Sequence, residues 1–175
     1  MTEVWQELRE NREAGARRLV AEYGDRLYAA ALFICPTPAD AEDLVFRTFE
    51  RAIDRIAQFV PKGDFFSWLY TIMLNFRRME LRKGCPDVIS MGTAMDLPEV
   101  VDDSLADALS SLDAERLREA VRKLPLLFAE VLVLRFFEER SLDEIALVLG
   151  IPVGTVKSRL HNAKVALRKE LGGWR

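Results

Sequence analysis

The stretch SLDEIALVLGIPVGTVKSRL, residues 141–160, restricts the possible folds of this 175-residue chain more than any other segment. Ser141 and Glu144 have the spacing of a capping box, which begins a helix, while Gly150 and Pro152 end that helix and turn the chain. A second helical pattern then continues to about Leu171. Two short helices joined by a tight turn with glycine predict a helix-turn-helix, which presents its second helix to duplex DNA.

The second of these helices has an apolar side and a polar side. Val156, Leu160, Ala163 and Leu167 recur at helical spacing and predict the side that packs inward. The candidate DNA-binding residues occupy other positions: Lys157, Ser158, His161, Asn162 and Lys164. Such side chains bond base edges or phosphates. The alternative reading is a basic, solvated helix in a four-helix bundle.

The distribution of charge shows how an acidic protein can carry a DNA-binding hairpin. The formal net charge is −3, but residues 1–83 are neutral overall and residues 115–175 carry a net +4. Residues 84–114 contain seven acids and no lysine or arginine. The acidity therefore belongs to one segment, and the hairpin itself is locally basic.

The acidic segment also divides the chain into two parts. Residues 84–111 contain several glycines and prolines and lack a sustained periodicity, so they are predicted to form a linker. The flanking parts, 1–83 and 112–175, both have helical periodicity. The predicted fold class is all-α: two small helical domains joined by a flexible acidic linker, the C-terminal one a four-helix domain with the helix-turn-helix.

Three helical patterns are predicted in the first part. One runs over 19–34 and is stopped by Pro36 and Pro38, and the next runs over 40–57. The third runs over 65–83, with an expected core stripe of Trp68, Leu69, Ile72, Phe76 and Met79. In the second part, the apolar helix that precedes the hairpin is expected to end near Arg135 and residues 138–140.

The helix predicted at 65–83 offers a second possible nucleic-acid surface. Its polar positions Thr71, Asn75, Arg78 and Arg82 follow one narrow stripe, and Phe59, Lys62, Phe65 and Phe66 lie upstream. Aromatic rings beside cations suit single-stranded nucleic acid, because bases stack on the rings while phosphates meet the cations. The pattern alone also allows the rings to be core and the arginines to be solvated.

No pattern in the sequence indicates catalysis, so the protein is predicted not to be an enzyme. There is no Ser/His/Asp or Cys/His arrangement and no glycine-rich phosphate loop. One histidine and two separated cysteines, Cys35 and Cys85, predict no metal site and no cofactor. The N-terminus lacks a signal-peptide pattern, and no apolar run approaches the ~20 residues of a membrane span. The predicted location is therefore the cytoplasm, without membrane insertion.

Three segments together resemble bacterial sigma factors of the sigma-70 family. They are DAEDLV with TF at 40–49, FFSWLYTIMLN at 65–75, and the region 124–171 that ends in the hairpin. The small size and short linker resemble the extracytoplasmic-function (ECF) group. The resemblance implies a factor that binds core RNA polymerase, recognises −35 and −10 promoter DNA, and has an anti-sigma factor as partner. It implies a region 2 domain at 1–83 and a region 4 domain at 112–175.

The resemblance also implies roles for particular residues. Polymerase docking falls to Asp40, Glu42, Asp43, Phe46 and Arg47. Recognition of −10 DNA, including capture of a flipped base, falls to Phe59, Lys62, Phe65, Phe66, Asn75, Arg78 and Arg82. Recognition of −35 DNA falls to Lys157, Ser158, His161, Asn162 and Lys164.

The chain departs from the family pattern at three places. Phe46-Arg47 replaces the usual Gln-Glu, Met79-Glu80 stands where an aspartate is usual, and Asn162 replaces a frequent basic residue. Two other functions remain compatible with the residues. One is a free, dimeric helix-turn-helix regulator, which would bind duplex DNA tightly without polymerase. The other is a sigma-like interaction protein without promoter activity.

Overall fold

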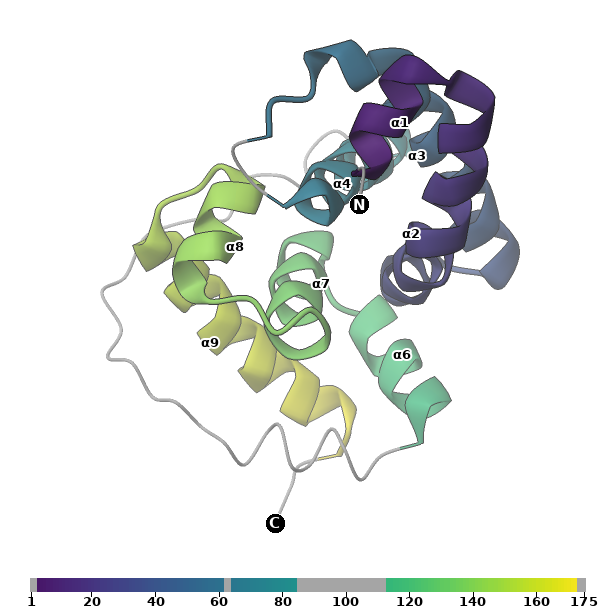
Figure 1. The fold of residues 1–175 in the computed structure, drawn as a ribbon. Coiled ribbons are helices and arrows are strands. Elements are labelled where there is room, and N and C mark those ends of the chain that lie inside the picture. Colours follow the sequence, from purple (N-terminus) through teal and green to yellow (C-terminus); the bar gives the residue numbers. More distant parts are fainter. Residues whose placement is uncertain (1–2, 62–63, 85–112, 173–175) are drawn as a thin grey trace. The chain divides into compact units, whose positions relative to one another are not determined.

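The computed structural model describes residues 3–61, 64–84 and 113–172, which lie in two compact units, Met1–Pro86 and Asp87–Arg175. Every regular element in the described ranges is a helix (Figure 1), so the predicted all-α class is confirmed. The linker predicted at 84–111 lies outside the described residues, apart from Gly84 at the end of a helix. The domain boundaries at 83 and 112 therefore stay predictions.

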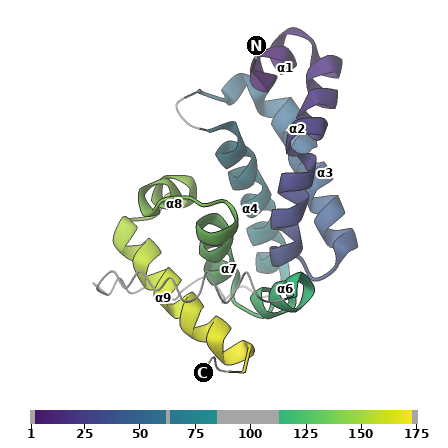
Figure 2. The same ribbon diagram turned by 60° about the horizontal axis from the view of Figure 1, so that its bottom comes forward.

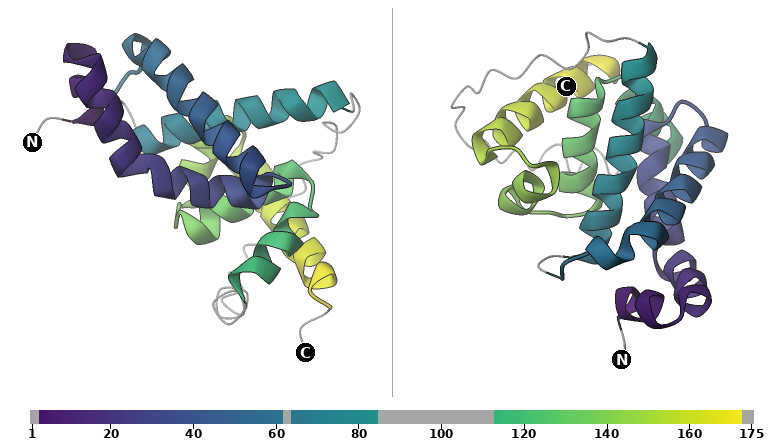
Figure 3. Two further views of the ribbon diagram at one scale, coloured as in Figure 1. Left: turned by 90° about the vertical axis from the view of Figure 1, so that its right-hand side faces the viewer. Right: turned by 90° about the horizontal axis from the view of Figure 1, so that it is seen from above.

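The described part of the N-terminal unit is built from α-helices and a short 3₁₀ turn. The elements are α1 (Val4–Glu10), α2 (Arg12–Ile34), α3 (Pro38–Arg55), η1 (Ile56–Gln58) and α4 (Phe65–Gly84). Figure 2 shows α2 and α3 side by side, and the left view of Figure 3 shows α1 folded back at the start of α2. Large buried side chains form the core between these helices, among them Leu19, Leu27, Leu44, Leu69 and Met73.

Polar caps set the boundaries of these helices, and one of them corrects a prediction. Asn11 accepts a hydrogen bond from a backbone N–H in the first turn of α2. Thr37 and Asp40 form a capping box at the start of α3, with Pro38 in its first turn. The preceding helix ends at Ile34, so Pro38 begins a helix rather than stopping one. The periodicity does not predict α1, because seven residues are too few to show a helical repeat.

The buried face of α4 differs from the predicted stripe. Its most buried side chains are Phe65, Phe66, Leu69, Tyr70, Met73 and Leu74. Of the expected stripe, only Leu69 is fully buried; Trp68, Ile72 and Phe76 are half-buried, and Met79 is 52% exposed. The prediction is wrong here because α4 is apolar on two adjacent faces, and helical spacing alone does not show which face meets the core.

The described part of the C-terminal unit contains the four helices that the sequence predicts. They are α6 (Ala114–Arg122), α7 (Leu126–Leu132) with its continuation η2 (Val133–Phe137), α8 (Leu142–Leu149) and α9 (Val153–Glu170). In Figure 1, α8 lies near the start of α9, and α7 packs along α9. The predicted inward residues of α9 are all buried: Val156, Leu160, Ala163 and Leu167.

The turn between α8 and α9 has the geometry that the sequence predicts. The Ser141 hydroxyl accepts a hydrogen bond from the Glu144 backbone N–H (3.2 Å), and the Glu144 carboxylate accepts one from the Ser141 N–H (2.8 Å). Hydrogen bonds that the Glu144 carboxylate accepts from the Ser141 N–H, the Ser141 hydroxyl and the Arg140 guanidinium lower the pKa of Glu144. Gly150 ends α8 at a φ of 65°, a left-handed conformation that favours glycine. Helices α8 and α9 therefore form a helix-turn-helix.

A π-helical turn ends the long apolar helix of the C-terminal unit. Within Val133–Phe137 the helix widens, and the Glu138 N–H bonds the Val133 carbonyl oxygen, five residues earlier (3.0 Å). Glu139 then takes a φ of 52°, which turns the chain toward α8. The predicted end of this helix is confirmed, whereas its π geometry has no counterpart in the sequence pattern.

Candidate nucleic-acid interface

Helix α9 presents polar and basic side chains on the side away from its buried residues. His161 and Asn162 are exposed, while Lys157 and Lys164 are half-buried. The Lys164 ammonium nitrogen lies 5.7 Å from the centroid of the Phe136 ring, so its stem follows η2. Four of the five residues predicted to bind −35 DNA therefore lie on one helix, two of them exposed and two half-buried.

Ser158, the fifth of these residues, is only 6% exposed. Its hydroxyl donates a hydrogen bond to the Thr155 carbonyl oxygen at 3.0 Å. A serine hydroxyl has one hydrogen to donate, and here that hydrogen is used within α9. The prediction that Ser158 contacts DNA does not fit this conformation, because the side chain is covered.

A buried ion pair holds α9 against α7. The Glu130 carboxylate accepts a hydrogen bond from the Arg159 guanidinium at 2.9 Å, and the two side chains are 2% and 20% exposed. A buried charge is costly without a partner, so the pair fixes the rotation of α9 about its own axis. That rotation decides which side chains face outward. The sequence signal for this contact is a single acid, Glu130, inside an apolar run.

The aromatic rings predicted to stack on DNA bases lie in the core of the N-terminal unit. Phe59, Phe65 and Phe66 are 5%, 6% and 0% exposed. The Phe59 ring centroid lies 4.9 Å from that of Phe65 and 5.2 Å from that of Trp68. The Arg26 guanidinium carbon lies 3.7 Å from the centroid of the Phe66 ring and covers it. In this conformation the three rings are covered, because a small helical unit uses such large rings to fill its core. Their role in stacking on bases stays a prediction.

The polar stripe of α4 is more accessible than the aromatic residues. Asn75 and Arg82 are exposed, and Arg78 is half-buried. Lys62, the remaining residue predicted for −10 recognition, lies outside the described residues. Of the residues predicted to bind −10 DNA, the polar side chains of α4 are therefore accessible, whereas the aromatic rings are not.

Asn75 opens onto a shallow groove of about 260 Å³ between α3 and α4. The groove is lined by Arg51, Arg55, Ile72, Asn75, Phe76 and Met79. The Arg51 guanidinium lies 5.6 Å from the centroid of the Phe76 ring. Within the described parts of the chain, Arg51 and Arg55 form no ion pair with a carboxylate. The groove therefore combines an apolar floor, an amide and two cations.

The sequence pattern does not predict this groove. Arg51 and Arg55 are four residues apart on α3, and Ile72, Phe76 and Met79 look like core residues of α4. The signal that could have revealed it is the second apolar stripe on α4, which the core does not need.

The residues predicted to dock polymerase lie on the exposed side of α3, with one exception. Asp40, Glu42 and Asp43 are exposed, and Phe46 is 62% exposed. The exception is Arg47, which turns toward α4, where it pairs with Glu80 and covers the Phe76 ring at 4.7 Å. The hydrogen bond that Arg47 donates to the Glu80 carboxylate raises the pKa of Arg47. Two departures from the family pattern, Arg47 and Glu80, thus contact each other.

Other kinds of site find little support. Among the described residues, no group of three or more histidine, cysteine, aspartate or glutamate side chains could hold a metal ion. No helix in the same ranges is long and apolar enough to cross a membrane. Burial raises the pKa of the Cys35 thiol to about 11, which leaves it unreactive near neutral pH.

Both units match models of known protein families. Residues 19–84 match the model for sigma-70 region 2, and residues 114–167 match the model for sigma-70 region 4. The two matches together define the class of protein as a sigma-70 factor. They cover α3, α4 and the helix-turn-helix, and they exclude α1.

Individual relatives narrow the class. The chain is 35% identical over 162 residues to the ECF RNA polymerase sigma factor SigW of Bacillus subtilis, covering 87% of each chain. It is 28% identical over 179 residues to the RNA polymerase sigma-H factor of Pseudomonas aeruginosa, covering 95% of this chain and 93% of that protein. The chain belongs to the ECF group of the sigma-70 family.

Solved structures agree with this assignment. The structure of CnrH in complex with the cytosolic domain of CnrY has a TM-score of 0.66 at 27% identity, covering 96% of this chain and 94% of that one. The sigma factor RpoE of Bartonella quintana, solved with the anti-sigma factor NepR, has a TM-score of 0.69 at 24% identity. That match covers 91% of this chain and 98% of the other, and it shows the fold alone.

Proposed function

We propose that this protein is an RNA polymerase sigma factor that binds core polymerase, recognises −35 and −10 elements, and directs promoter-specific initiation. The observation that carries the proposal is the helix-turn-helix, whose second helix exposes His161 and Asn162 beside the half-buried Lys157, in a chain of the sigma-70 family. In this role the protein is an initiation factor rather than an enzyme, and it works in the cytoplasm.

Recognition of the −35 element is assigned to α9. The N-terminal half of a recognition helix enters the major groove, where each base pair presents a distinct set of donors and acceptors. Lys157 can donate to guanine acceptors, Asn162 can pair with adenine, and His161 lies between them on the exposed side. Lys164 then contacts the phosphate backbone.

Capture of an unstacked −10 base is assigned to the groove between α3 and α4. Its apolar floor at Ile72 and Phe76 can cover the face of a base, and the Asn75 amide can both donate to and accept from a base edge. Arg51 and Arg55 supply cations for the adjoining phosphates. Flipping a base out of the duplex costs a few kcal/mol. The contacts to the base face, the base edge and the phosphates must therefore act together to offset that cost.

Polymerase docking is assigned to the outward side of α3. Glu42 and Asp43 offer carboxylates, and Phe46 adds an exposed aromatic ring of the kind that anchors protein interfaces. Arg47 is less available, because it already pairs with Glu80. The docking surface is therefore acidic with one aromatic anchor.

The two DNA sites depend on each other. Each contacts few bases and binds weakly alone, but docking both units on one polymerase raises the effective concentration of the second site. Binding of the −35 element by α9 then favours capture at the α3–α4 groove. An anti-sigma factor that covers either unit would prevent this, and the sigma factor RpoE of Bartonella quintana was solved with the anti-sigma factor NepR. We include an anti-sigma factor among the partners of this chain.

Run-off transcription with purified core polymerase tests the proposal. A promoter-specific transcript that depends on this protein is expected from at least one promoter selected by sequencing transcripts after overexpression. A free helix-turn-helix regulator would bind duplex DNA without polymerase, and an interaction protein would give neither transcript nor DNA binding. Either result would contradict the proposal.

Paired substitutions test the two assigned sites. Lys157→Ala is expected to weaken −35-dependent initiation about tenfold, the discrimination typical of one base contact, without weakening core binding. Lys169→Ala removes the same charge from the last turn of α9 and should change initiation much less.

Asn75→Ala should weaken binding of a single-stranded −10 oligonucleotide, whereas Asn162→Ala should leave that binding unchanged. Loss of core binding in any of these variants would contradict the assigned roles.

A further inference from the structure

Helix α1 lies outside the region that matches the family, yet it is packed firmly into the N-terminal unit. Val4 and Leu8 are 2% and 3% exposed. Glu7 forms an ion pair with Arg18 of α2 at 3.0 Å, and both side chains are less than one-third exposed. The helix therefore has its own buried face and its own ionic contact with α2.

Gly15 shows how closely α1 approaches α2. A Cβ atom at this position would lie 2.5 Å from both the Cα and the backbone nitrogen of Leu8. No side chain fits at such a distance, because the obstacle is backbone rather than a flexible group. Glycine at position 15 therefore allows α1 to fold directly onto the first turns of α2.

From this position, Arg9 reaches the end of α3. Its guanidinium donates to the Phe59 carbonyl oxygen at 2.7 Å and to the Ile56 carbonyl oxygen at 3.1 Å. The same guanidinium lies 5.0 Å from the Trp5 ring centroid, and the Trp5 and Phe59 centroids are 5.8 Å apart. One side chain of α1 thus joins two carbonyl groups of the segment that leaves α3.

These two carbonyl groups belong to the connection between the walls of the groove. The Ile56 carbonyl oxygen also accepts the Phe59 N–H at 3.1 Å, and a cation is favourable at this C-terminal end because helix carbonyl oxygens point toward it. Arg55, which lines the groove, immediately precedes Ile56. On the other side, Phe59 packs against Phe65 and Trp68 in the first turn of α4. Arg9 therefore binds the segment that joins the C-terminal end of α3, one wall of the groove, to the first turn of α4, the other wall.

We propose that Arg9 is a positioning residue for the α3–α4 groove, and that α1 serves to hold that groove ready for an unstacked promoter base. Arg9 touches no DNA in this role. A groove fixed before binding loses less conformational entropy when it captures a base, so removing Arg9 weakens capture. The inference rests on the proposed function of the groove.

The test measures binding of a fluorescent single-stranded −10 oligonucleotide to the polymerase holoenzyme. Arg9→Met keeps the length of the side chain but removes its donors, and we expect about tenfold weaker binding, the contribution of two ordinary hydrogen bonds. Arg9→Lys retains a cation with donors and should recover most of the loss. Core binding and binding of a −35 duplex should stay within about twofold of the parent protein, because neither uses the groove.

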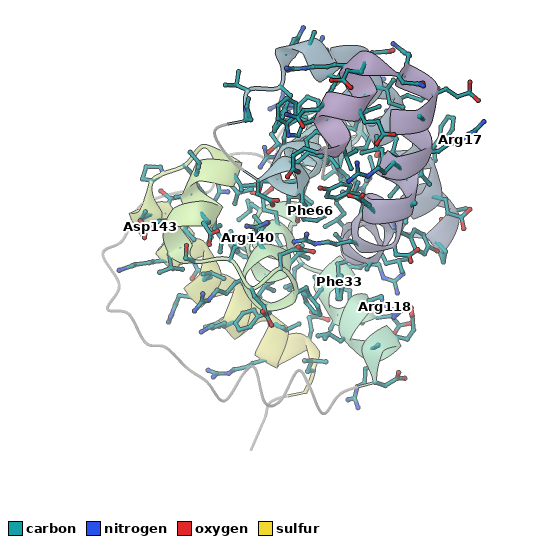
Figure 4. The ribbon with its side chains drawn as sticks, viewed as in Figure 1. Arg17, Phe33, Phe66, Arg118, Arg140 and Asp143 are labelled. Atoms are coloured by element: carbon teal, nitrogen blue, oxygen red, sulfur yellow. The ribbon has the colours of Figure 1, made fainter. Side chains whose placement is uncertain are left out.

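Two further variants separate positioning from simple destabilisation. Arg17→Met is the matched control, because Arg17 projects outward from α2 (Figure 4) and its side chain is 79% exposed. It should bind the oligonucleotide as the parent does. Gly15→Ala displaces α1 without altering Arg9, and it should reproduce the loss seen in Arg9→Met.

Each outcome either supports or overturns the inference. Undiminished capture by Arg9→Met overturns it, and so does a joint loss of capture, core binding and −35 binding, which would show a general structural role. Failure of Arg9→Lys to recover any capture also counts against it. If the parent holoenzyme itself gives no promoter-specific transcript, the proposed function fails first, and the inference falls with it.

Discussion

Each unit of the protein contains an arginine–glutamate pair that joins two helices, but the two pairs differ in burial. In the C-terminal unit, Glu130 of α7 and Arg159 of α9 have side chains that are 2% and 20% exposed. In the N-terminal unit, Arg47 of α3 and Glu80 of α4 are 35% and 34% exposed. One pair is shielded from water, and the other is only partly covered.

The difference separates two ways of orienting a helix. The buried pair cannot lose one partner without leaving a charge in a poorly solvated place, so it fixes α9 strongly. The half-exposed pair is weakened by water and salt, so it contributes little to stability. Its importance lies in where it directs Arg47, which turns toward α4 while its guanidinium still reaches Asp43 of the predicted polymerase-docking surface at 3.4 Å. Burial thus decides whether an ion pair holds a helix or merely orients a side chain.

The largest expected effect comes from breaking the buried pair. Glu130→Gln should lower the free energy of unfolding of the C-terminal unit by about 3 kcal/mol, the lower end for such pairs, because Arg159 is one-fifth exposed. Hydrogen exchange of the α7 and α9 amides measures this change. Glu119→Gln, an exposed position on α6, is the control. A loss below 1 kcal/mol would show that the pair does not fix α9.

A smaller effect is expected at the cap of α8, where the contacts are local. Ser141→Ala should cost about 1 kcal/mol, because it removes the hydroxyl that accepts from the Glu144 N–H. Exchange of the first-turn amides of α8 should increase, while amides of α4 in the other unit should not change. An equal increase in both units would mean that their stabilities are coupled.

The half-exposed pair should show a still smaller effect. Arg47→Gln is expected to cost about 0.5 kcal/mol at low salt, and the difference should shrink as salt is added. Urea unfolding of the N-terminal unit, followed by hydrogen exchange, measures both values. A cost as large as that of Glu130→Gln would remove the distinction between the two pairs.

The smallest expected effect is a pH dependence in the stability of the first turn of α8, which the Ser141–Glu144 capping box begins. The pKa of Glu144 is lowered by its bonds from Ser141 and Arg140, so its stabilising contribution is complete above the pKa of an unfolded glutamate. That contribution disappears as the pH falls through the lower, folded-state pKa. Glu144→Gln should therefore weaken the first turn of α8 at pH 7 and approach the parent in acid. A difference that grows as the pH falls would reverse this sign.

The sequence predicts the C-terminal unit better than the N-terminal unit, for a physical reason. The helix-turn-helix depends on local signals, such as the Ser141 cap and the left-handed Gly150, and both have the predicted geometry. The role of Ser158 is less predictable, because its burial depends on which groups cover α9.

In the N-terminal unit, the interface depends on contacts between distant segments. Phe59, Phe65 and Phe66 have the composition of a base-stacking surface, yet they pack on residues of α1 and α2: Trp5, Tyr23 and Arg26 respectively. The Arg9 contacts join residues 47 and 50 positions apart, and no periodicity predicts such a pairing. The pairing of Arg47 with Glu80 likewise appears only when α3 and α4 are placed together.

The π turn at Val133–Phe137 has a consequence for how this protein can change in length. A π turn holds one residue more than the α turn that it replaces. Because the wide turn covers about the same rotation as one α turn, deleting its extra residue would restore regular α-helical bonding and leave everything that follows in nearly the same orientation relative to α7. A residue added to or removed from the regular α-helical part of α7 would instead rotate the following elements by about 100° and move the helix-turn-helix out of alignment with Glu130. Proteins descended from this one should therefore lose a residue more readily within the π turn than elsewhere in α7.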